Sequence, residues 1–324
     1  MILQSTYRHV PWLANGHMET IVPSAFRTVK GVLYRRQRLE LSDGDFVDLD
    51  WLVNTDVPTK KLVIISHGLE GSSGRHYSRG MAKYFHARGW DALAWNCRSC
   101  SGELNRLPRF YHHGDTQDLH SVIEEAFRKE YDHVALVGFS MGGSFSMKYV
   151  GERGATVDRR IKGAVGFSVP CSLASSAQEL DTPGKRFYRN RFLRKLGKKI
   201  LAKSMIYPEV LSYDGYEKIL TFRQFDDRYT AKLHGFKNAT DFYKKSSCDQ
   251  YLDNIRVPAL IVNAANDPFL TKECFPKEIA HDHRYFNLEI PTRGGHVGFS
   301  LGQGEENYME RRAFEFVETK PQNG

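Results

Sequence analysis

Residues 134–144, which read VALVGFSMGGS, join an apolar run to a Gly-x-Ser-x-Gly motif. An apolar run rich in valine and leucine is typical of a buried strand, and the residues after the motif can continue as a helix. In that context the motif indicates a nucleophile elbow, a strained turn that exposes the serine, here Ser140. Gly138 and Gly142 fit this turn because a Cβ at either position would collide with backbone packed beside it. The alternative is a glycine-rich turn around a buried serine, because five-residue patterns recur by chance.

The composition is that of an ordinary globular protein. Of 324 residues, 41% are hydrophobic and 12% aromatic, so the chain can bury a large core, and extensive disorder is not expected. The formal net charge of +8 is modest for this length. Five cysteines do not indicate a disulfide framework and fit a reducing compartment. Because we find neither a signal-peptide pattern nor an apolar run of about 20 residues, we expect a soluble, cytoplasmic protein.

Apolar runs of strand length alternate with helical patterns along the chain. Besides the run before Ser140, strands are predicted at residues 34–41, 46–53, 62–65, 91–96, 163–167, 259–263 and 285–290. The first two flank a Gly-containing turn and indicate an antiparallel hairpin. Helices at about residues 77–88 and 118–130 separate later strands, so the pattern predicts a mostly parallel, eight-stranded sheet flanked by helices. Residues 1–30, irregular and rich in large apolar groups, are predicted to form an N-terminal arm packed against this core.

The alternation stops between residues 171 and 247, where helical patterns continue without an obvious strand. We interpret residues 171–247 as a helical cap inserted after the sixth strand, which leaves residues 1–170 and 248–324 as the core. Within the cap, residues 185–203 surround an apolar stripe with lysines and arginines; the stripe is Tyr188, Phe192, Leu196 and Ile200. Such a helix can bind a membrane surface or an acidic ligand. We favour a stripe that faces the core, with weak peripheral membrane contact as the alternative.

A serine nucleophile needs a base, an acid that orients the base, and donors for the oxyanion. Behind a nucleophile elbow, the acid and then the histidine follow on loops after late strands. Asp267 lies in the loop after the predicted strand 259–263, and His296 lies among glycines after strand 285–290. We therefore predict that Ser140 is the nucleophile, His296 the general base and Asp267 the residue that orients it.

The oxyanion donors are predicted to be the backbone N–H groups of Met141, next after the nucleophile, and of Leu69, in the loop after strand 62–65. Other candidates for the acid or the nucleophile fit less well. Asp115 and Asp118 precede the serine, Asp226 and Asp227 lie near the end of the cap, and Ser144 and Ser146 lie past the elbow.

A cysteine pair and three histidines could have functional roles, but structural roles are favoured for them. Cys97 and Cys100 form a C-x-x-C pair without a second pair, and the pair follows a strand, so neither a zinc site nor redox activity is expected. His112 and His113 lack a third ligand at sensible spacing. His17 could face a substrate pocket, although a structural role is favoured. Without a dinucleotide fingerprint, a P-loop or a nucleic-acid module, we expect no metal, no cofactor and no nucleic-acid partner.

Nine stretches of the chain together resemble the YheT-like branch of the α/β-hydrolases. They are residues 15–21 (NGHMETI), 67–73 (HGLEGSS), 96–103 (NCRSCSGE), 105–106 (NR), 111–112 (YH), 138–143 (GFSMGG), 225–228 (FDDR), 266–269 (NDPF) and 294–298 (GGHVG). The resemblance implies the α/β-hydrolase fold, and the family's triad positions fall on Ser140, Asp267 and His296. The chain departs from the family pattern at Asn266, where a second aspartate is common, and at Ser99, where glycine is common.

The expected activity is hydrolysis of a small-molecule carboxylic ester through an acyl-enzyme. The apolar stripe of the cap motivates a short- to medium-chain acyl group. Transfer of the acyl group to an alcohol, as in an ester synthase, and cleavage of a thioester use the same triad and stay open. A non-catalytic binding protein on the same fold is the alternative from another class. The sequence leaves the physiological substrate, the oligomeric state and any movement of the cap undetermined.

Overall fold

The computed structural model describes residues 1–55, 57–302 and 304–319. Within them, nine strands form one sheet in the order β1-β9-β8-β7-β6-β4-β5-β3-β2. The strands are β1 (Ile2–Leu3), β2 (Arg35–Glu40), β3 (Phe46–Leu52), β4 (Lys61–Ser66), β5 (Asp91–Asn96), β6 (His133–Phe139), β7 (Ile161–Phe167), β8 (Ala259–Val262) and β9 (Phe286–Glu289). The pairs β2–β3 and β3–β5 are antiparallel, and the other neighbours are parallel. Positions 56, 303 and 320–324 of the predicted core lie outside the described residues.

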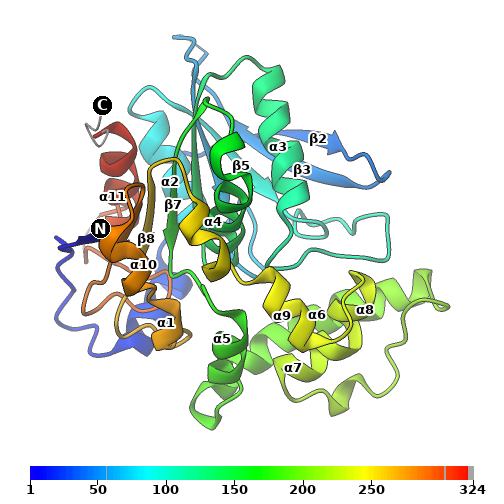
Figure 1. Ribbon diagram of the computed structural model, residues 1–324. Coiled ribbons are helices and arrows are strands. Elements are labelled where there is room, and N and C mark those ends of the chain that lie inside the picture. The colour runs from blue at the N-terminus through cyan, green and yellow to red at the C-terminus, as the bar shows by residue number, and fades with distance from the viewer. Residues whose placement is uncertain (56, 303, 320–324) are drawn as a thin grey trace.

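Helices cover both faces of this sheet and extend beyond one end of it (Figure 1). The α-helices are α1 (Gly16–Phe26), α2 (His76–His86), α3 (Thr116–Arg128), α4 (Met141–Arg153), α5 (Leu173–Leu180), α6 (Arg186–Ile206), α7 (Phe222–Phe225), α8 (Ala231–Leu233), α9 (Ala239–Ser246), α10 (Lys277–Asp282) and α11 (Tyr308–Glu318). The short helices are η1 (Gly154–Thr156), η2 (Pro183–Lys185), η3 (Tyr216–Lys218), η5 (Asp249–Asn254), η6 (Lys272–Cys274) and the π-helical turn η4 (Asp226–Thr230).

The central strands are apolar throughout because both of their faces are covered. In β4, Leu62 and Ile64 join a core cluster with residues of α3 and α4, whereas Val63 and Ile65 join a second cluster with residues of α2 and α11. Successive side chains of a strand point to opposite faces, so one run of four apolar residues supplies both cores. Burial of each such side chain stabilises the fold by about 1.5–3 kcal/mol.

The sheet has nine strands rather than the predicted eight, and residues 1–30 are not irregular throughout, because they contain β1 and α1. The additional strand β1 lies at the edge and pairs in parallel with β9, and α1 follows it along the chain. A two-residue strand has no readable period, while Gly16 and Pro23 inside α1 disfavour a helix assignment. The side chain of Asn15 starts this helix by accepting the N–H of Met18 at 3.0 Å.

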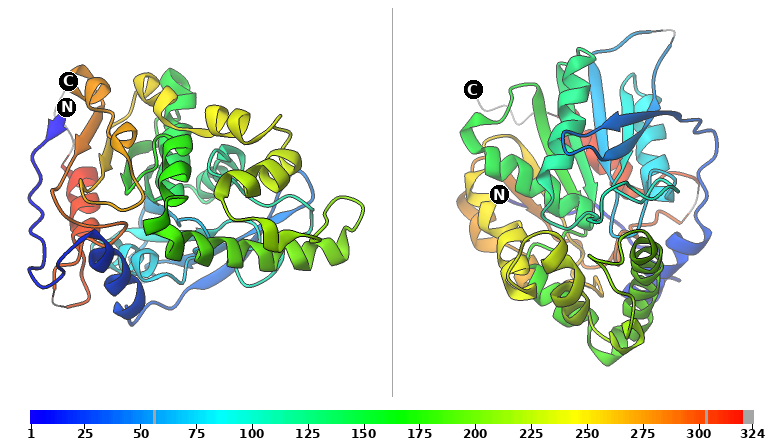
Figure 2. Two further views of the ribbon diagram at one scale, coloured as in Figure 1. Left: turned by 90° about the horizontal axis from the view of Figure 1, so that it is seen from below. Right: turned by 90° about the vertical axis from the view of Figure 1, so that its right-hand side faces the viewer.

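Between β7 and β8 the chain forms helices only, from α5 to η5. Helices α5 to α9 gather beyond one end of the sheet in Figure 1 and in the right-hand view of Figure 2. The predicted stripe of α6 is turned inward, since Tyr188 and Ile200 are buried and Phe192 and Leu196 are half-buried. The division into a core and a cap stays a prediction. Among the described residues, every helix is too short or too polar to cross a membrane.

Candidate active site

Ser140 occupies the turn between β6 and α4. Its φ of +53° and ψ of −118° form a backbone conformation that residues other than glycine rarely adopt. Its N–H donates to the carbonyl of Phe167, at the end of β7, at 2.8 Å. A Cβ on Gly138 would overlap the carbonyl of Gly142, and a Cβ on Gly142 would overlap that of Ser66. The turn therefore packs too closely for any larger residue at these two glycines.

His296 joins Ser140 to Asp267. Its Nε2 lies 2.9 Å from the Ser140 hydroxyl oxygen, and its Nδ1 lies 3.0 and 2.9 Å from the two carboxylate oxygens of Asp267. Because a carboxylate only accepts, Nδ1 carries the proton and Nε2 is free to accept from the serine hydroxyl. The loops that carry the three residues follow β6, β8 and β9, whose carboxyl ends meet at one edge of the sheet.

Phe269 packs against both partners of the serine. Its backbone N–H donates to the Asp267 carboxylate at 2.9 Å, and its ring stacks on the imidazole of His296 with centroids 4.0 Å apart. The Asp267 side chain has no exposed surface and the His296 side chain is 9% exposed. Charge that develops on the imidazole therefore meets the carboxylate in surroundings with little water to screen it.

Helix α1 supports the loop that carries His296, a role that the sequence did not reveal. The hydroxyl of Thr20 accepts the backbone N–H of His296 at 2.8 Å and donates to the carbonyl of Gly16. The buried carboxylate of Glu19 accepts the N–H of Gly294 at 3.1 Å. The one signal available in the sequence was that this helix contains the matching stretch at residues 15–21.

The loop after β4 passes close to the nucleophile, since a Cβ on Gly68 would lie 3.2 Å from the Cβ of Ser140. His67 shapes this loop: its Nδ1–H donates to the carbonyl of Gly68 at 2.7 Å, and its Nε2 accepts the N–H of Cys97 at 3.1 Å. Burial lowers the pKa of His67 to about 4, so its ring is neutral near neutral pH. Sequence reasoning missed this function of His67.

Of the two predicted oxyanion donors, Met141 directly follows Ser140 in the chain, and Leu69 belongs to the loop after β4. Met141 is the first residue of α4, where helix N–H groups have no partner within the helix and the helix dipole favours negative charge. Leu69 lines the same cavity as Ser140. Their role as oxyanion donors stays a prediction.

Two cavities meet at Ser140 and His296, one of about 1050 Å³ and one of about 800 Å³, with their open mouths included. The larger lies between the sheet edge and the helices after β7. Its apolar wall includes Leu173, Leu180, Phe192, Leu196, Phe222 and Phe225. The smaller opens between α1, the loop after β4 and α6, and its wall includes the cations Arg75, Arg191 and Lys195. An ester held at Ser140 can thus place its two halves in different surroundings.

The cysteine pair and His17, which the sequence also offered as candidate functional residues, make contacts outside the Ser140–His296–Asp267 group. Both Cys97 and Cys100 are free thiols, and burial raises the pKa of each, which disfavours a reactive thiolate. His17 approaches the hydroxyl of Tyr188 in α6 at 3.0 Å through its Nδ1. No three His, Cys, Asp or Glu side chains of the described chain are close enough to hold a metal ion.

The carboxylates considered as rivals of Asp267 lie away from the serine or on another wall. Asp118 binds the buried guanidinium of Arg98 at 2.8 Å, and Asp115 lies close to Arg109. Asp226 lines the larger cavity together with His112 and His113. The side chain of Ser144 is fully buried, and that of Ser146 donates to the helix carbonyl of Gly142.

Known hydrolases resemble this chain over most of its length. The family model Hydrolase_4, described as "Serine aminopeptidase, S33", matches residues 57–275. The Escherichia coli (strain K12) protein named "Putative esterase YheT" is 34% identical over 294 residues, which cover 89% of this chain and 85% of that protein. "Phospholipase ABHD3" of Mus musculus is 26% identical over 333 residues, which cover all of this chain and 80% of its own length.

A similar fold occurs in the α/β hydrolase GrgF from Penicillium sp. sh18, with a TM-score of 0.58 at 16% identity over 89% of this chain and 99% of that one. A strained serine at the end of a central parallel strand, joined to a histidine and a carboxylate from later loops, defines a protein built as an α/β hydrolase. The chain belongs to the α/β-hydrolase family, and its resemblance to the YheT-like branch is confirmed. The predicted fold class and enzyme class are confirmed with it.

Proposed function

We propose that this protein is a serine carboxylester hydrolase that acts through an acyl-enzyme on a short- to medium-chain ester. The observation that carries the proposal is the 2.9 Å contact between Ser140 Oγ and a histidine whose other nitrogen is held by a buried carboxylate. The printed names of the relatives, an esterase, a phospholipase and a monoacylglycerol lipase, agree with ester hydrolysis.

In the proposed mechanism, Ser140 Oγ attacks the acyl carbon while its proton passes to Nε2 of His296. The N–H groups of Met141 and Leu69 stabilise the resulting oxyanion. When the tetrahedral intermediate collapses, the C–O bond to the alcohol breaks and the alcohol leaves with the proton from His296. Water then attacks the acyl-enzyme with His296 again as base, which releases the acid and restores the serine. Asp267 keeps the imidazole in the required tautomer and stabilises the imidazolium.

The two cavities suggest how an ester is bound. The larger, mostly apolar cavity suits the acyl chain, because each methylene that leaves water contributes about 0.8 kcal/mol to binding. The smaller, cationic cavity suits the alcohol half. We also infer that residues 171–247 form a cap over the core, because they supply much of the apolar wall of the acyl cavity. Weak membrane contact through α6 stays a prediction.

The first test is labelling with a fluorophosphonate, comparing the wild type with Ser140→Ala, together with hydrolysis of p-nitrophenyl esters of increasing chain length. We expect labelling and turnover in the wild type and a loss of turnover on the order of 10⁶-fold in the variant. A folded wild type that neither reacts nor turns over ester would contradict the proposal and favour a binding protein. Equal activity from acetate to long chains would contradict the acyl preference alone.

Transfer and thioester cleavage are separated by their products. With ethanol present, an ester synthase forms an ethyl ester from the acyl-enzyme, whereas a hydrolase releases only the free acid. A matched thioester of the same acyl chain measures the thioesterase alternative directly. We expect free acid as the main product and a higher kcat/KM for the oxygen ester.

A further inference from the structure

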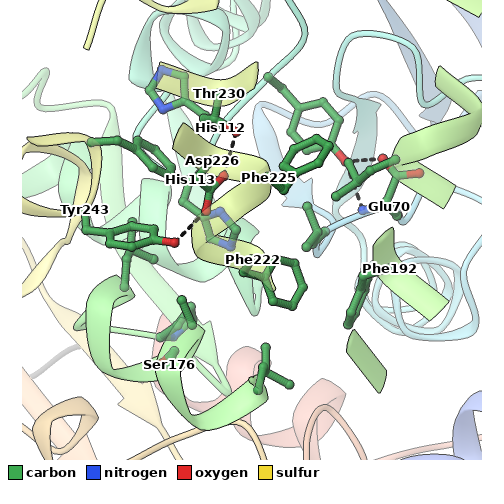
Figure 3. Close-up of a pocket in the computed structure, with 18 of the residues that line it drawn as sticks. Glu70, His112, His113, Ser176, Phe192, Phe222, Phe225, Asp226, Thr230 and Tyr243 are labelled. Carbon is green, nitrogen blue, oxygen red and sulfur yellow. Dashed lines mark hydrogen bonds between the residues drawn. The ribbon is translucent and has the colours of Figure 1, made fainter. Parts of the chain in front are cut away.

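The wall of the acyl cavity is not apolar throughout. Asp226, Tyr243 and Thr230 meet on one side of it, with His112 and His113 beside them and Phe192 across the cavity (Figure 3). The proposed ester chemistry does not use any of these polar side chains. The matching stretch at residues 225–228, which contains Asp226, also has no role in that chemistry.

Asp226 is held in place by two donors. The Thr230 hydroxyl donates to Oδ1 at 2.6 Å, and the Tyr243 hydroxyl donates to Oδ2 at 2.7 Å. Asp226 and Thr230 are the ends of η4, a π-helical turn between α7 and α8, and Tyr243 belongs to α9. Single π-helical turns often occur at functional sites. Each carboxylate oxygen has a second lone pair, so the group can still pair with a ligand.

Burial raises the pKa of Asp226 to about 7, so both of its protonation states are populated near neutral pH. The neighbouring histidines stay neutral there, because burial lowers the pKa of His112 to about 3 and that of His113 to about 4. Lys199 also lines the cavity, but it is already paired with Glu70 at 2.6 Å. Lys148 and Arg109, whose charges act on His112, do not line the cavity, so this side of its wall offers hydrogen bonds without a positive charge.

His113 is the least satisfied of these polar groups. Its ring lines the cavity, and within the described part of the chain no hydrogen bond to its side chain is formed. His112, by contrast, accepts the N–H of Gly114 at 3.1 Å and packs against His234. The half-buried ring of His113 therefore leaves its nitrogens available to a ligand in the cavity.

We propose that Asp226 and His113 form a subsite that binds a hydroxyl group on the acyl chain, so that the preferred substrate is an ester of a hydroxylated acid. A hydroxyl both donates and accepts, so it can pair with either protonation state of the carboxyl and with the neutral imidazole at once. A carboxylate on the chain would be buried without a cation, and a plain methyl group would leave the polar groups unpaired. This inference rests on the proposed ester hydrolysis and specifies its acyl group.

The test compares p-nitrophenyl esters of plain acids with esters of hydroxy acids of the same length, with the hydroxyl moved along the chain. We expect one hydroxyl position to raise kcat/KM at least tenfold over the plain ester, because sites built to bind a hydroxyl reject analogues that lack it. Half-esters of dicarboxylic acids are expected to react no faster than plain esters. The proposal is overturned if the wild type has no higher kcat/KM for any hydroxy-acid ester than for the plain ester, or if it prefers the half-esters of dicarboxylic acids.

The variants are Asp226→Asn, which keeps the shape of the side chain, and His113→Phe, which keeps a ring. Each is expected to reduce the hydroxyl preference, which is the ratio of kcat/KM for the hydroxylated ester to that for the plain ester, at least fivefold. Asp227→Asn is the matched control. The Asp227 carboxylate accepts the N–H of Ala239 at 2.6 Å, and Asp227 is not part of the cavity wall. An unchanged preference in both variants contradicts the assignment.

A second readout does not depend on turnover. In Ser140→Ala, the hydroxy acid is expected to raise the Tm more than the plain acid of equal length does, and Asp226→Asn is expected to remove the difference. If the wild type shows no labelling and no turnover, the proposed function fails, while a retained difference in Tm still identifies the subsite. If the wild type hydrolyses esters but shows neither a hydroxyl preference nor a difference in Tm, only the subsite proposal fails.

Discussion

Asn266 shows why one departure from the family pattern suits this chain. Its Nδ2 donates to the carboxylate of Glu19 at 2.7 Å, and its Oδ1 accepts the N–H of Gly295 at 3.1 Å. An amide can do both, whereas an aspartate here would set a second carboxylate against Glu19. Arg293 binds the other oxygen of Glu19 at 3.1 Å. These bonds join the loop of Asp267 to the loop of His296, so the amide aligns the two partners of the serine.

The buried carboxyl of Asp226 leads to a prediction about stability and pH. Its pKa is about 7 in the folded protein and 3.8 in the reference state, so between these values the folded state binds more protons than the unfolded state. The free energy of unfolding therefore falls as the pH rises through this range. From pH 5 to pH 8 the wild type is expected to lose about 3 kcal/mol relative to Asp226→Asn, which does not titrate.

Urea unfolding of both proteins at several pH values measures this difference. Asp227→Asn serves as the control, because the side chain of Asp227 is partly exposed. A constant gap between wild type and Asp226→Asn from pH 5 to pH 8 would show that the carboxyl does not titrate abnormally.

At the scale of elements, α6 holds the loop that carries the predicted oxyanion donor. Lys199 donates to the buried carboxylate of Glu70 at 2.6 Å, and Lys195 donates to the carbonyl of Glu70 at 3.1 Å. Tyr111 completes the clamp: its hydroxyl donates to the same carboxylate at 2.7 Å and accepts the Glu70 N–H at 3.0 Å. Glu70, the residue next to Leu69, is thus held both by α6 and by Tyr111, which lies between β5 and α3.

Lys199→Met is expected to remove the cation from this clamp. A buried carboxylate that loses its partner costs about 3 kcal/mol, so the Tm should fall. Because the loop of Leu69 loses its tether, kcat for p-nitrophenyl acetate should fall about tenfold or more, with little change in KM. Lys198→Met, an exposed neighbour on the same helix, should leave both quantities unchanged. Full kcat in a destabilised Lys199→Met protein would show that the clamp supports only the fold.

These elements can be predicted from the sequence where contacts between residues close together in the chain determine them. The strands around residues 62–65 and 134–139 follow from their apolar runs, and the order of Ser140, Asp267 and His296 follows from loops after those strands. The role of Glu19 could not be predicted, because it depends on contacts with residues about 250 to 275 positions away. Edge strand β1 is too short to show a period, and its pairing with β9 is equally distant.

At the scale of the whole molecule, the acyl cavity exists only because the helices after β7 lie over the carboxyl ends of the strands. Open α/β sheets bind ligands at these ends, where loops from several strands meet. In the proposed mechanism the loops supply the reacting groups, while α5, α6 and α7 supply most of the apolar wall of the cavity. In the proposed function, catalysis and acyl selectivity thus belong to different parts of the chain, so one substitution can change selectivity and leave catalysis intact.

Ala177→Phe tests this separation. Ala177 lies on α5 and faces the cavity, so a phenyl ring there fills space that a longer acyl chain would occupy. If the ring displaces about three methylenes, at about 0.8 kcal/mol each, kcat/KM for the longest accepted p-nitrophenyl ester should fall roughly 50-fold. Hydrolysis of the acetate and labelling of Ser140 should stay within about twofold, because neither needs the far end of the cavity. Ala174→Phe, on the exposed side of the same helix, controls for the added ring. Equal losses for acetate and for the long ester would mean that α5 supports the catalytic residues themselves, and that the acyl chain lies elsewhere.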